Sequence, residues 1–242
     1  MALGSQPRWT VRPAVGQVGV DIDVGLRDYM LRIYNYMASG LALTGIVAYV
    51  FAQSGFYAQV AATPLIYLLM LAPLGFVLVL SFGIQRMQAS TAQALFWLFS
   101  AVMGLSLASI FLVFTGASIA RVFFITSGTF AAMSLYGYTT KRDLTQFGSF
   151  LIMGLIGIII ASLVNLFIAS SALQFAISVI GVIVFVGLTA YDTQRIKGMY
   201  FEIDHSDGQM AGKTAIMGAL TLYLDFINLF IMLLQLIGVR RD

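Results

Sequence analysis

Long apolar runs separated by short polar connections occupy the chain from residue 37 onward. A helix of roughly 17–25 apolar residues crosses the hydrocarbon core of a bilayer, because each residue adds ~1.5 Å to its length. None of the runs shows the strict alternation typical of a membrane strand. The sequence therefore predicts an all-α membrane protein with seven transmembrane helices, at residues 37–56, 65–84, 92–115, 122–138, 147–168, 173–191 and 215–237.

The composition agrees with this class and excludes several others. Hydrophobic residues make up 60% of the chain and charged residues 10%, against about 25% charged residues in soluble domains. With no Cys and one His, the chain cannot form disulfides or thiolate metal sites, and we expect no cofactor. Intramembrane catalysis also fits poorly, because the HExxH motif of zinc proteases is absent and the single His lies in a connection. We therefore expect a protein that is not an enzyme and does not bind nucleic acid.

The chain divides into a polar arm at residues 1–28 and a single transmembrane domain at residues 29–242. Residues 29–36 alternate at helical spacing and are predicted to form an interfacial lead into the first span, with their tyrosines at the headgroup level. Those tyrosines are Tyr29, Tyr34 and Tyr36.

Basic residues are distributed unequally between the two sides of the predicted bundle, which sets its orientation by the positive-inside rule. The arm side carries Arg8, Arg12, Arg27, Arg32, Arg86, Lys141, Arg142, Arg195, Lys197 and Lys213, and the other side carries Arg121, Arg240 and Arg241. We therefore place the N-terminus in the cytoplasm of a multi-pass protein of the cell membrane. Seven full crossings put the C-terminus outside, whereas a re-entrant last span would return it; we favour seven crossings.

Asp225 is the most unusual residue, because it lies near the middle of the last apolar run with Asn228 one turn further on. A charged carboxylate near the bilayer centre costs ~2.5–3.5 kcal/mol even on the most lenient scale. The residue is tolerated only if it is protonated, paired or in contact with water. Its alternatives are a structural hydrogen bond between helices and a functional site, and we favour the functional site.

Asp192 is the second candidate, within GLTAYDTQRIKG at the end of the sixth run. Gly187, Tyr191 and Arg195 lie on its face of the helix at spacings of three and four. The alternative is an ordinary interfacial Asp paired with Arg195 or Arg86.

The two aspartates lie on consecutive, antiparallel spans, so they can form a pair. Two carboxyl groups at one site share a proton; when both are ionised they form an all-oxygen site suited to Ca²⁺. Their depths disagree, however. Asp192 lies ~28 Å along a span that begins at residue 173, close to the cytoplasmic edge, whereas Asp225 lies ~15 Å in from that edge. Contact requires a deeper start of the last span, a strong tilt or a water-filled crevice.

Other polar positions have weaker claims. Arg86 either neutralises the aspartates in a closed state or serves as a positive-inside anchor. Asn165, Asn228 and Tyr191 are candidates for polar lining, with helix–helix hydrogen bonding as the alternative for the two Asn. The acidic connection FEIDHSDG, residues 201–208, does not match an EF-hand.

Two C-terminal motifs resemble the Bax inhibitor family, also called the transmembrane Bax inhibitor motif family. LTLYLDFINLFIMLLQLIG at 220–238 is similar to the last-span signature of that family, and GLTAYDTQRIK at 187–197 to its span-six signature. LRDYMLRIYNYMASGLALTG at 26–45 resembles bacterial members. The similarity extends from about residue 26 to the end of the chain.

The resemblance implies a fold in which the C-terminal helix is central and the other six surround it. It also implies a pH-dependent Ca²⁺ leak controlled by Asp192 and Asp225, with a basic latch at either Gln85 or Arg86. The leading hypothesis is therefore a pH-gated, Ca²⁺-permeable channel or transporter of the bacterial inner membrane, with Ca²⁺ and protons as its ions. The alternative is a membrane-embedded regulator that binds a membrane-bound ATP-dependent protease or another membrane complex.

Overall fold

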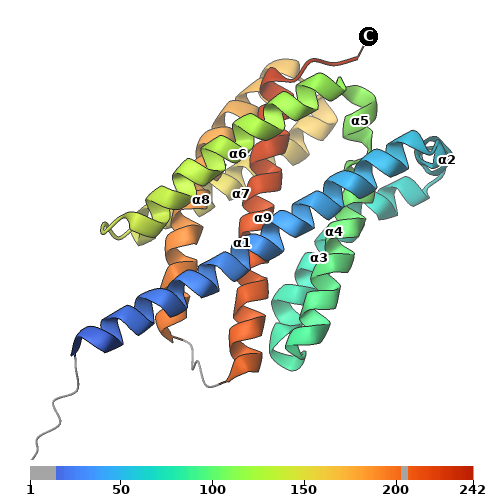
Figure 1. Cartoon of the computed structure of the whole chain (residues 1–242). Helices are drawn as coiled ribbons and strands as arrows, with labels where there is room; N and C mark the ends of the chain where they lie inside the picture. Colours follow the sequence, from blue (N-terminus) through green and yellow to red (C-terminus); the bar gives the residue numbers. More distant parts are fainter. Residues whose placement is uncertain (1–14, 203–206, 242) are drawn as a thin grey trace, which may run out of the picture.

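A computed structural model describes residues 15–202 and 207–241. Within these ranges the chain is almost entirely helical and forms no named strand. Seven helical segments are long and apolar enough to cross a membrane, which confirms the predicted fold class (Figure 1). The helices are α1 (Val15–Gln53), α2 (Phe56–Ala61), α3 (Leu65–Gly83), the 3₁₀ turn η1 (Ile84–Arg86), α4 (Ala89–Leu107), α5 (Ser109–Val113), α6 (Gly116–Thr139), α7 (Thr145–Ile168), α8 (Ser171–Glu202) and α9 (Gly208–Ile237).

The first helix differs most from its predicted bounds. α1 runs without interruption from Val15 to Gln53, and its membrane-spanning part begins at Val24. The predicted boundary between arm and domain at residue 28 therefore falls inside a continuous helix. The first 14 residues of the predicted arm lie outside the described residues.

α9 is the most deeply embedded of the seven spans. In its most apolar window 56% of residues are buried, against 11% in α3 and in α7. α9 packs against α1, α4, α6 and α8, whereas α3 packs mainly on α4 and α7 mainly on α8 (Figure 1). The resemblance implied six helices around the last one; four of them make extensive contact with it, and α3 and α7 form an outer layer. Burial in protein explains why a span with a carboxyl group near its middle is tolerated.

The two ends of α9 are fixed to opposite ends of the bundle. At its start, Asp207 caps the helix by accepting hydrogen bonds from the N–H groups of Gln209 and Met210, and Gln209 accepts one from the N–H of Ala89 at the start of α4. After its end, Val239 accepts a hydrogen bond from the N–H of Thr115, just before α6. α9 therefore extends from the α3–α4 connection to the α5–α6 connection, as a full crossing requires and a re-entrant helix does not.

A buried aspartate pair between the last two helices

The candidate site lies on the interface between α8 and α9, which pack antiparallel along most of their length. On α8 the interface residues are small or apolar apart from one acid, at spacings of three and four: Gly181, Phe185, Leu188, Asp192 and Ile196. The facing positions of α9 follow the same spacing: Gly218, Leu222, Asp225, Leu229 and Met232. The repeated spacing places each set on one helix face, so each helix presents one carboxyl group in an otherwise apolar row.

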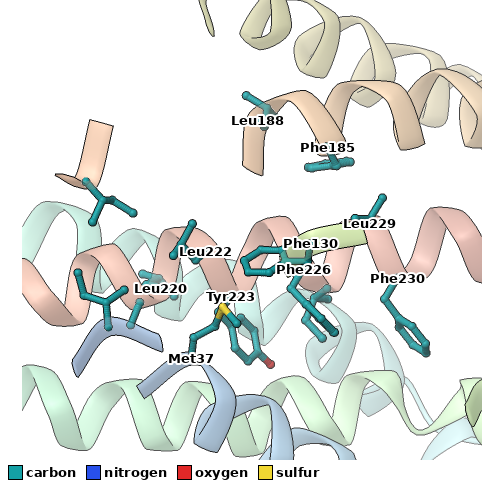
Figure 2. Close-up of a cluster of buried hydrophobic side chains, with 14 of the residues drawn as sticks. Met37, Phe130, Phe185, Leu188, Leu220, Leu222, Tyr223, Phe226, Leu229 and Phe230 are labelled. Atoms are coloured by element: carbon teal, nitrogen blue, oxygen red, sulfur yellow. The ribbon is translucent and has the colours of Figure 1, made fainter. Parts of the chain in front are cut away.

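Close contacts fix the register of these two rows. A side chain added at Gly181 would lie 2.8 Å from Met232, and one added at Gly218 would lie 3.3 Å from Ile196. In this register Asp192 faces the part of α9 that carries Asp225. Figure 2 shows Leu229 on the side of α9 that faces α8, and Tyr223 on the opposite side beside Met37 of α1.

The two carboxyl groups are buried and interact with each other. Asp192 is 8% exposed and Asp225 5% exposed, and their side chains lie close enough for each to act on the charge of the other. Oδ2 of Asp225 is buried and receives no hydrogen bond from an N–H or hydroxyl group of the described residues. Two carboxylates have only acceptor atoms, so a hydrogen bond between them requires a proton on one of them. The geometry therefore brings together the two aspartates that the sequence singled out, in an arrangement suited to a shared proton.

The depth disagreement came from the predicted helix ends. α8 continues to Glu202, so Asp192 lies ten residues, or ~15 Å, before the end of that helix. α9 begins earlier than predicted, at Gly208, so Asp225 lies ~26 Å from its start. The contact between Gly218 and Ile196 shows that the first turns of α9 extend past the end of α8, which accounts for most of the remaining offset. Neither a strong tilt nor a water-filled crevice is needed.

The charged neighbours of the pair are few. Arg195, one turn along α8, acts on the charge of Asp192 through space, but it is exposed and forms no ion pair with it. Arg86 is exposed in η1 and makes no ion pair or side-chain hydrogen bond within the described part of the chain. Gln85 accepts a hydrogen bond at its carbonyl from Lys213. Neither candidate for the basic latch is joined to the aspartates in this structure.

The three residues suggested as polar lining have other contacts. Tyr191 packs against Gly148, where an added side chain would meet its ring, so it faces α7 and not α9. Asn165 lies at the other end of the bundle, where it accepts a hydrogen bond from the N–H of Ser170 and donates one to Gln174. Asn228 donates to the carbonyl of Leu224 on its own helix. The structure assigns none of the three to the aspartate pair.

Sequence reasoning missed two tyrosine hydroxyl groups near the pair, one half-buried and one buried, that join helices. Tyr34 of α1, placed at the headgroup level from its position, hydrogen-bonds Ser134 of α6, and Ser134 hydrogen-bonds Thr193, the residue after Asp192. Tyr223, two residues before Asp225, hydrogen-bonds Thr44 of α1 at 2.6 Å. The sequence did contain a signal, because Thr44 and Ser134 lie within apolar runs. Hydroxyl side chains in such runs often join helices in membranes. Tyr29 also differs from its prediction, because its ring is buried beside Tyr200 of α8.

The pair by itself is a sparse cation site. No group of three or more His, Cys, Asp or Glu that could hold a metal occurs in the described residues, and Ca²⁺ takes six to eight oxygen ligands. Tyr34, Phe226 and other residues line two cavities in this part of the bundle, and neither aspartate lines either of these two. Both aspartates are instead buried in the packing of α8 and α9.

Asp143, outside the spans, offers an exposed carboxyl group for contrast. It precedes α7 and accepts hydrogen bonds from the N–H (2.9 Å) and the hydroxyl (2.6 Å) of Thr145. These two bonds favour the ionised form and hold the pKa of Asp143 below its usual value.

The fold and the site define a class of protein. It is a helical membrane bundle whose last span is packed among its neighbours and carries one half of a buried aspartate pair. Residues 26–242 match the family model described as "Inhibitor of apoptosis-promoting Bax1". The chain therefore belongs to the Bax inhibitor family, as its motifs indicated.

Relatives in several bacteria agree with this assignment. The chain is 54% identical over 219 residues to the inner membrane protein YbhL of Escherichia coli K12, covering 90% of this chain and 94% of the relative. It is 53% identical over 221 residues to a protein of Rickettsia prowazekii, covering 91% and 93%. A membrane protein of Streptococcus pyogenes serotype M6 is 36% identical over 224 residues, covering 91% and 96%.

Proposed function

We propose that the protein is a pH-sensitive leak pathway for Ca²⁺ in the bacterial inner membrane, gated by the proton shared between Asp192 and Asp225. Seven apolar helices and the name of the Escherichia coli relative support the location. The observation that supports the gate is the closeness of two buried carboxyl groups. Oδ2 of Asp225 has no hydrogen-bond donor among the described residues.

The gate follows from the charge states of the pair. With one proton, the carboxyl groups are joined by a hydrogen bond between an acid and a carboxylate, which is roughly twice as strong as a neutral one. When that proton is lost, two negative charges face each other in a medium of low dielectric constant and repel. The repulsion weakens the packing of α8 on α9 and exposes carboxylate oxygens to water. A divalent cation then neutralises both charges, with water and backbone carbonyls supplying its remaining ligands.

The expected pH dependence has a defined sign. The protonated pair is the closed state, so Ca²⁺ flux is low at acidic pH and rises as the pH increases. Because one proton is shared, the closed-to-open ratio changes by at most ~10-fold per pH unit.

Ca²⁺ uptake into proteoliposomes containing a trapped indicator, measured from pH 5 to pH 9, tests the gate. Asp192→Asn and Asp225→Asn should each remove the pH dependence, because the remaining carboxyl group has no second carboxylate to repel when it ionises. Asp143→Asn is the matched control: it also removes one carboxylate, but from an exposed connection, so it should retain the wild-type profile. Unchanged pH dependence in both pair variants would refute the gate. If Asp143→Asn also lost the pH dependence of Ca²⁺ uptake, that dependence would come from surface charge and not from the aspartate pair.

A further inference from the structure

A large cavity separates α1 from α6 on one side of the bundle. α1 packs on α4 and α9, and α6 packs on α8 and α9, so α1 and α6 lie apart from each other while both contact α9 (Figure 1). The cavity has a volume of about 1190 Å³, with Phe226 of α9 at its base. Its walls follow α1 from Val24 to Ile46 and α6 from Phe123 to Tyr138. We call it the α1–α6 groove.

Apolar side chains line most of this groove, at the depth of the hydrocarbon. Both walls belong to membrane-spanning segments. Leu31 is 46% exposed, and Ile46 and Leu135 are each 62% exposed, so the groove is open to the surrounding medium at its edges. Water is a poor occupant of an apolar groove, and the medium around a spanning helix is lipid. The occupant that matches the walls is a hydrocarbon chain.

The polar group in the middle of the groove already has partners. Tyr34 lines the groove, and its hydroxyl is hydrogen-bonded to Ser134. Ser134 in turn hydrogen-bonds Thr193 behind the wall. The middle of the groove therefore requires no polar ligand, and an acyl chain can lie along it without leaving a hydroxyl group unpaired.

The groove lining includes a basic residue at one end and no charged residue at the other. Arg27 lines the end where α1 enters the membrane and is exposed. Tyr138 lines the same end. The ammonium group of Lys197 lies 5.0 Å from the centre of the Tyr138 ring and donates a hydrogen bond to the Tyr138 carbonyl. The exposed Lys141 and Arg142 follow α6 directly at this end. At the opposite end the lining residues Gly45, Ile46 and Phe123 carry no charge.

The length of the groove fits a lipid in one leaflet. Arg27 and Ile46 are 19 positions apart on one helix, or ~28 Å, so the groove covers nearly the full ~30 Å of hydrocarbon. An acyl chain anchored at the cationic end needs about half of that length. The basic end also lies on the side that the positive-inside rule places in the cytoplasm, where a negatively charged membrane surface attracts cations.

We propose that the α1–α6 groove binds an anionic phospholipid of the surrounding bilayer, with its phosphate at Arg27 and one acyl chain between α1 and α6 over Phe226. This site is separate from the aspartate pair and does not depend on the proposed gate. The bound chain fills the space where α1 and α6 fail to meet and holds both helices against α9.

Native mass spectrometry of the detergent-solubilised protein, titrated with phosphatidylglycerol or with phosphatidylcholine of the same acyl chains, tests the site. We expect one phosphatidylglycerol molecule to be retained at concentrations where phosphatidylcholine is not. Arg27→Gln should lower the preference for phosphatidylglycerol roughly fivefold, because one basic residue near an anionic headgroup contributes about that factor. Arg121→Gln, near the opposite end of the groove and outside the cavity lining, is the matched control and should keep the preference.

Variants that fill the groove provide a second test of the lipid site. Ala42→Trp and Ser127→Trp place a large ring in the groove from opposite walls and should each abolish retention of the single lipid. Leu71→Trp adds a ring on the outer face of α3, where Leu71 is 64% exposed, and should leave retention unchanged. Circular dichroism and gel filtration identify any variant that does not fold. If one of the two groove variants fails to fold, the variant on the opposite wall gives the result. Equal retention in Ala42→Trp, Ser127→Trp and Leu71→Trp would show general surface lipid only and overturn the proposal, as would equal affinity of the wild type for both lipids.

Discussion

The α8–α9 interface joins polar side chains at two places by different chemistry, and we call these places the amide end and the acidic end. At one end Gln174 donates to Gln235 at 2.6 Å and accepts from Asn165 at 3.2 Å, and Ser178 also donates to Gln235. At the other end Asp192 and Asp225 meet. Each amide carries both donors and acceptors, so the first end is satisfied at any pH. Two carboxyl groups need a proton from outside, so the second end depends on pH.

Burial strengthens this difference. Gln235 is exposed and Gln174 is half-buried, whereas both aspartates are buried. A broken hydrogen bond at the amide end is replaced by water at little cost, but ionisation of both carboxyl groups at the acidic end leaves two charges with little solvent around them. The interface therefore has one constant attachment and one conditional attachment. The comparison explains how α8 can loosen from α9 at one end without the bundle coming apart.

The largest expected effect comes from giving the acidic end the chemistry of the amide end. The double variant Asp192→Asn/Asp225→Asn should form an amide pair and lose all dependence of Ca²⁺ flux on pH between 5 and 9. Its thermal unfolding midpoint should also be the same at pH 5 and pH 8, whereas that of the wild type should be lower at pH 8. Scanning fluorimetry in detergent measures the second quantity. A wild-type midpoint that is equal at both pH values would show that the pair does not titrate in this range.

The second effect comes from the packing that braces the acidic end. A side chain added at Gly137 of α6 would clash with the carbonyl oxygen of Ala190, two residues before Asp192. Because backbone atoms cannot move aside locally, Gly137→Ala should push α6 from α8 and destabilise the protein by ~1–3 kcal/mol. Gly45→Ala is the control, because no atom lies within 4 Å of the added carbon. Thermal unfolding of both variants measures the difference, and equal midpoints would contradict the close packing of α6.

Much of this site could be predicted from the sequence, because carboxyl groups in apolar runs are costly wherever they occur. The expense of Asp225, and the spacing that places Asp192 on a defined face of its helix, required no coordinates. The hydropathy pattern also gave all seven spans. What it could not give were the helix ends outside the hydrocarbon, because polar residues at a membrane surface neither require nor forbid a helix. That error produced the depth disagreement for Asp192 and the short first span.

The direction of each side chain was the second feature that the sequence could not predict. Tyr191 lies next to Asp192 in the sequence, yet one residue is a rotation of ~100° on a helix, so it faces Gly148 of α7. Tyr34 lies near the predicted membrane surface, but it turns towards Ser134 of a helix that is distant in the sequence. Such pairings depend on which helices are neighbours, and periodicity within one helix carries no information about that.

The third effect reverses the comparison by giving the amide end the chemistry of the acidic end. Gln174→Glu/Gln235→Glu replaces a satisfied amide pair by two carboxyl groups. We expect the protein to be destabilised by ~1 kcal/mol at pH 8, where both groups ionise, and by less at pH 5. The effect is limited because Gln235 is exposed and water screens its charge. Unfolding midpoints at the two pH values give the result; a larger loss at pH 5 than at pH 8 would have the wrong sign for carboxylate repulsion.

The smallest effect belongs to Asp143, a carboxyl group that is neither buried nor paired with another acid. Its hydrogen bonds from Thr145 hold its pKa below the usual value, so its ionised form stabilises the start of α7. That stabilisation is present above the pKa of the unfolded chain and is lost as the pH falls through the lower pKa of the folded state. Asp143→Ala should therefore be slightly less stable than the wild type at pH 7, and the difference between their midpoints should shrink below about pH 4. The aspartate pair should show the opposite trend, since protonation strengthens it. If Asp143→Ala instead differed from the wild type more at acidic pH than at pH 7, the contrast between a solvated carboxylate and a buried acidic pair would fail.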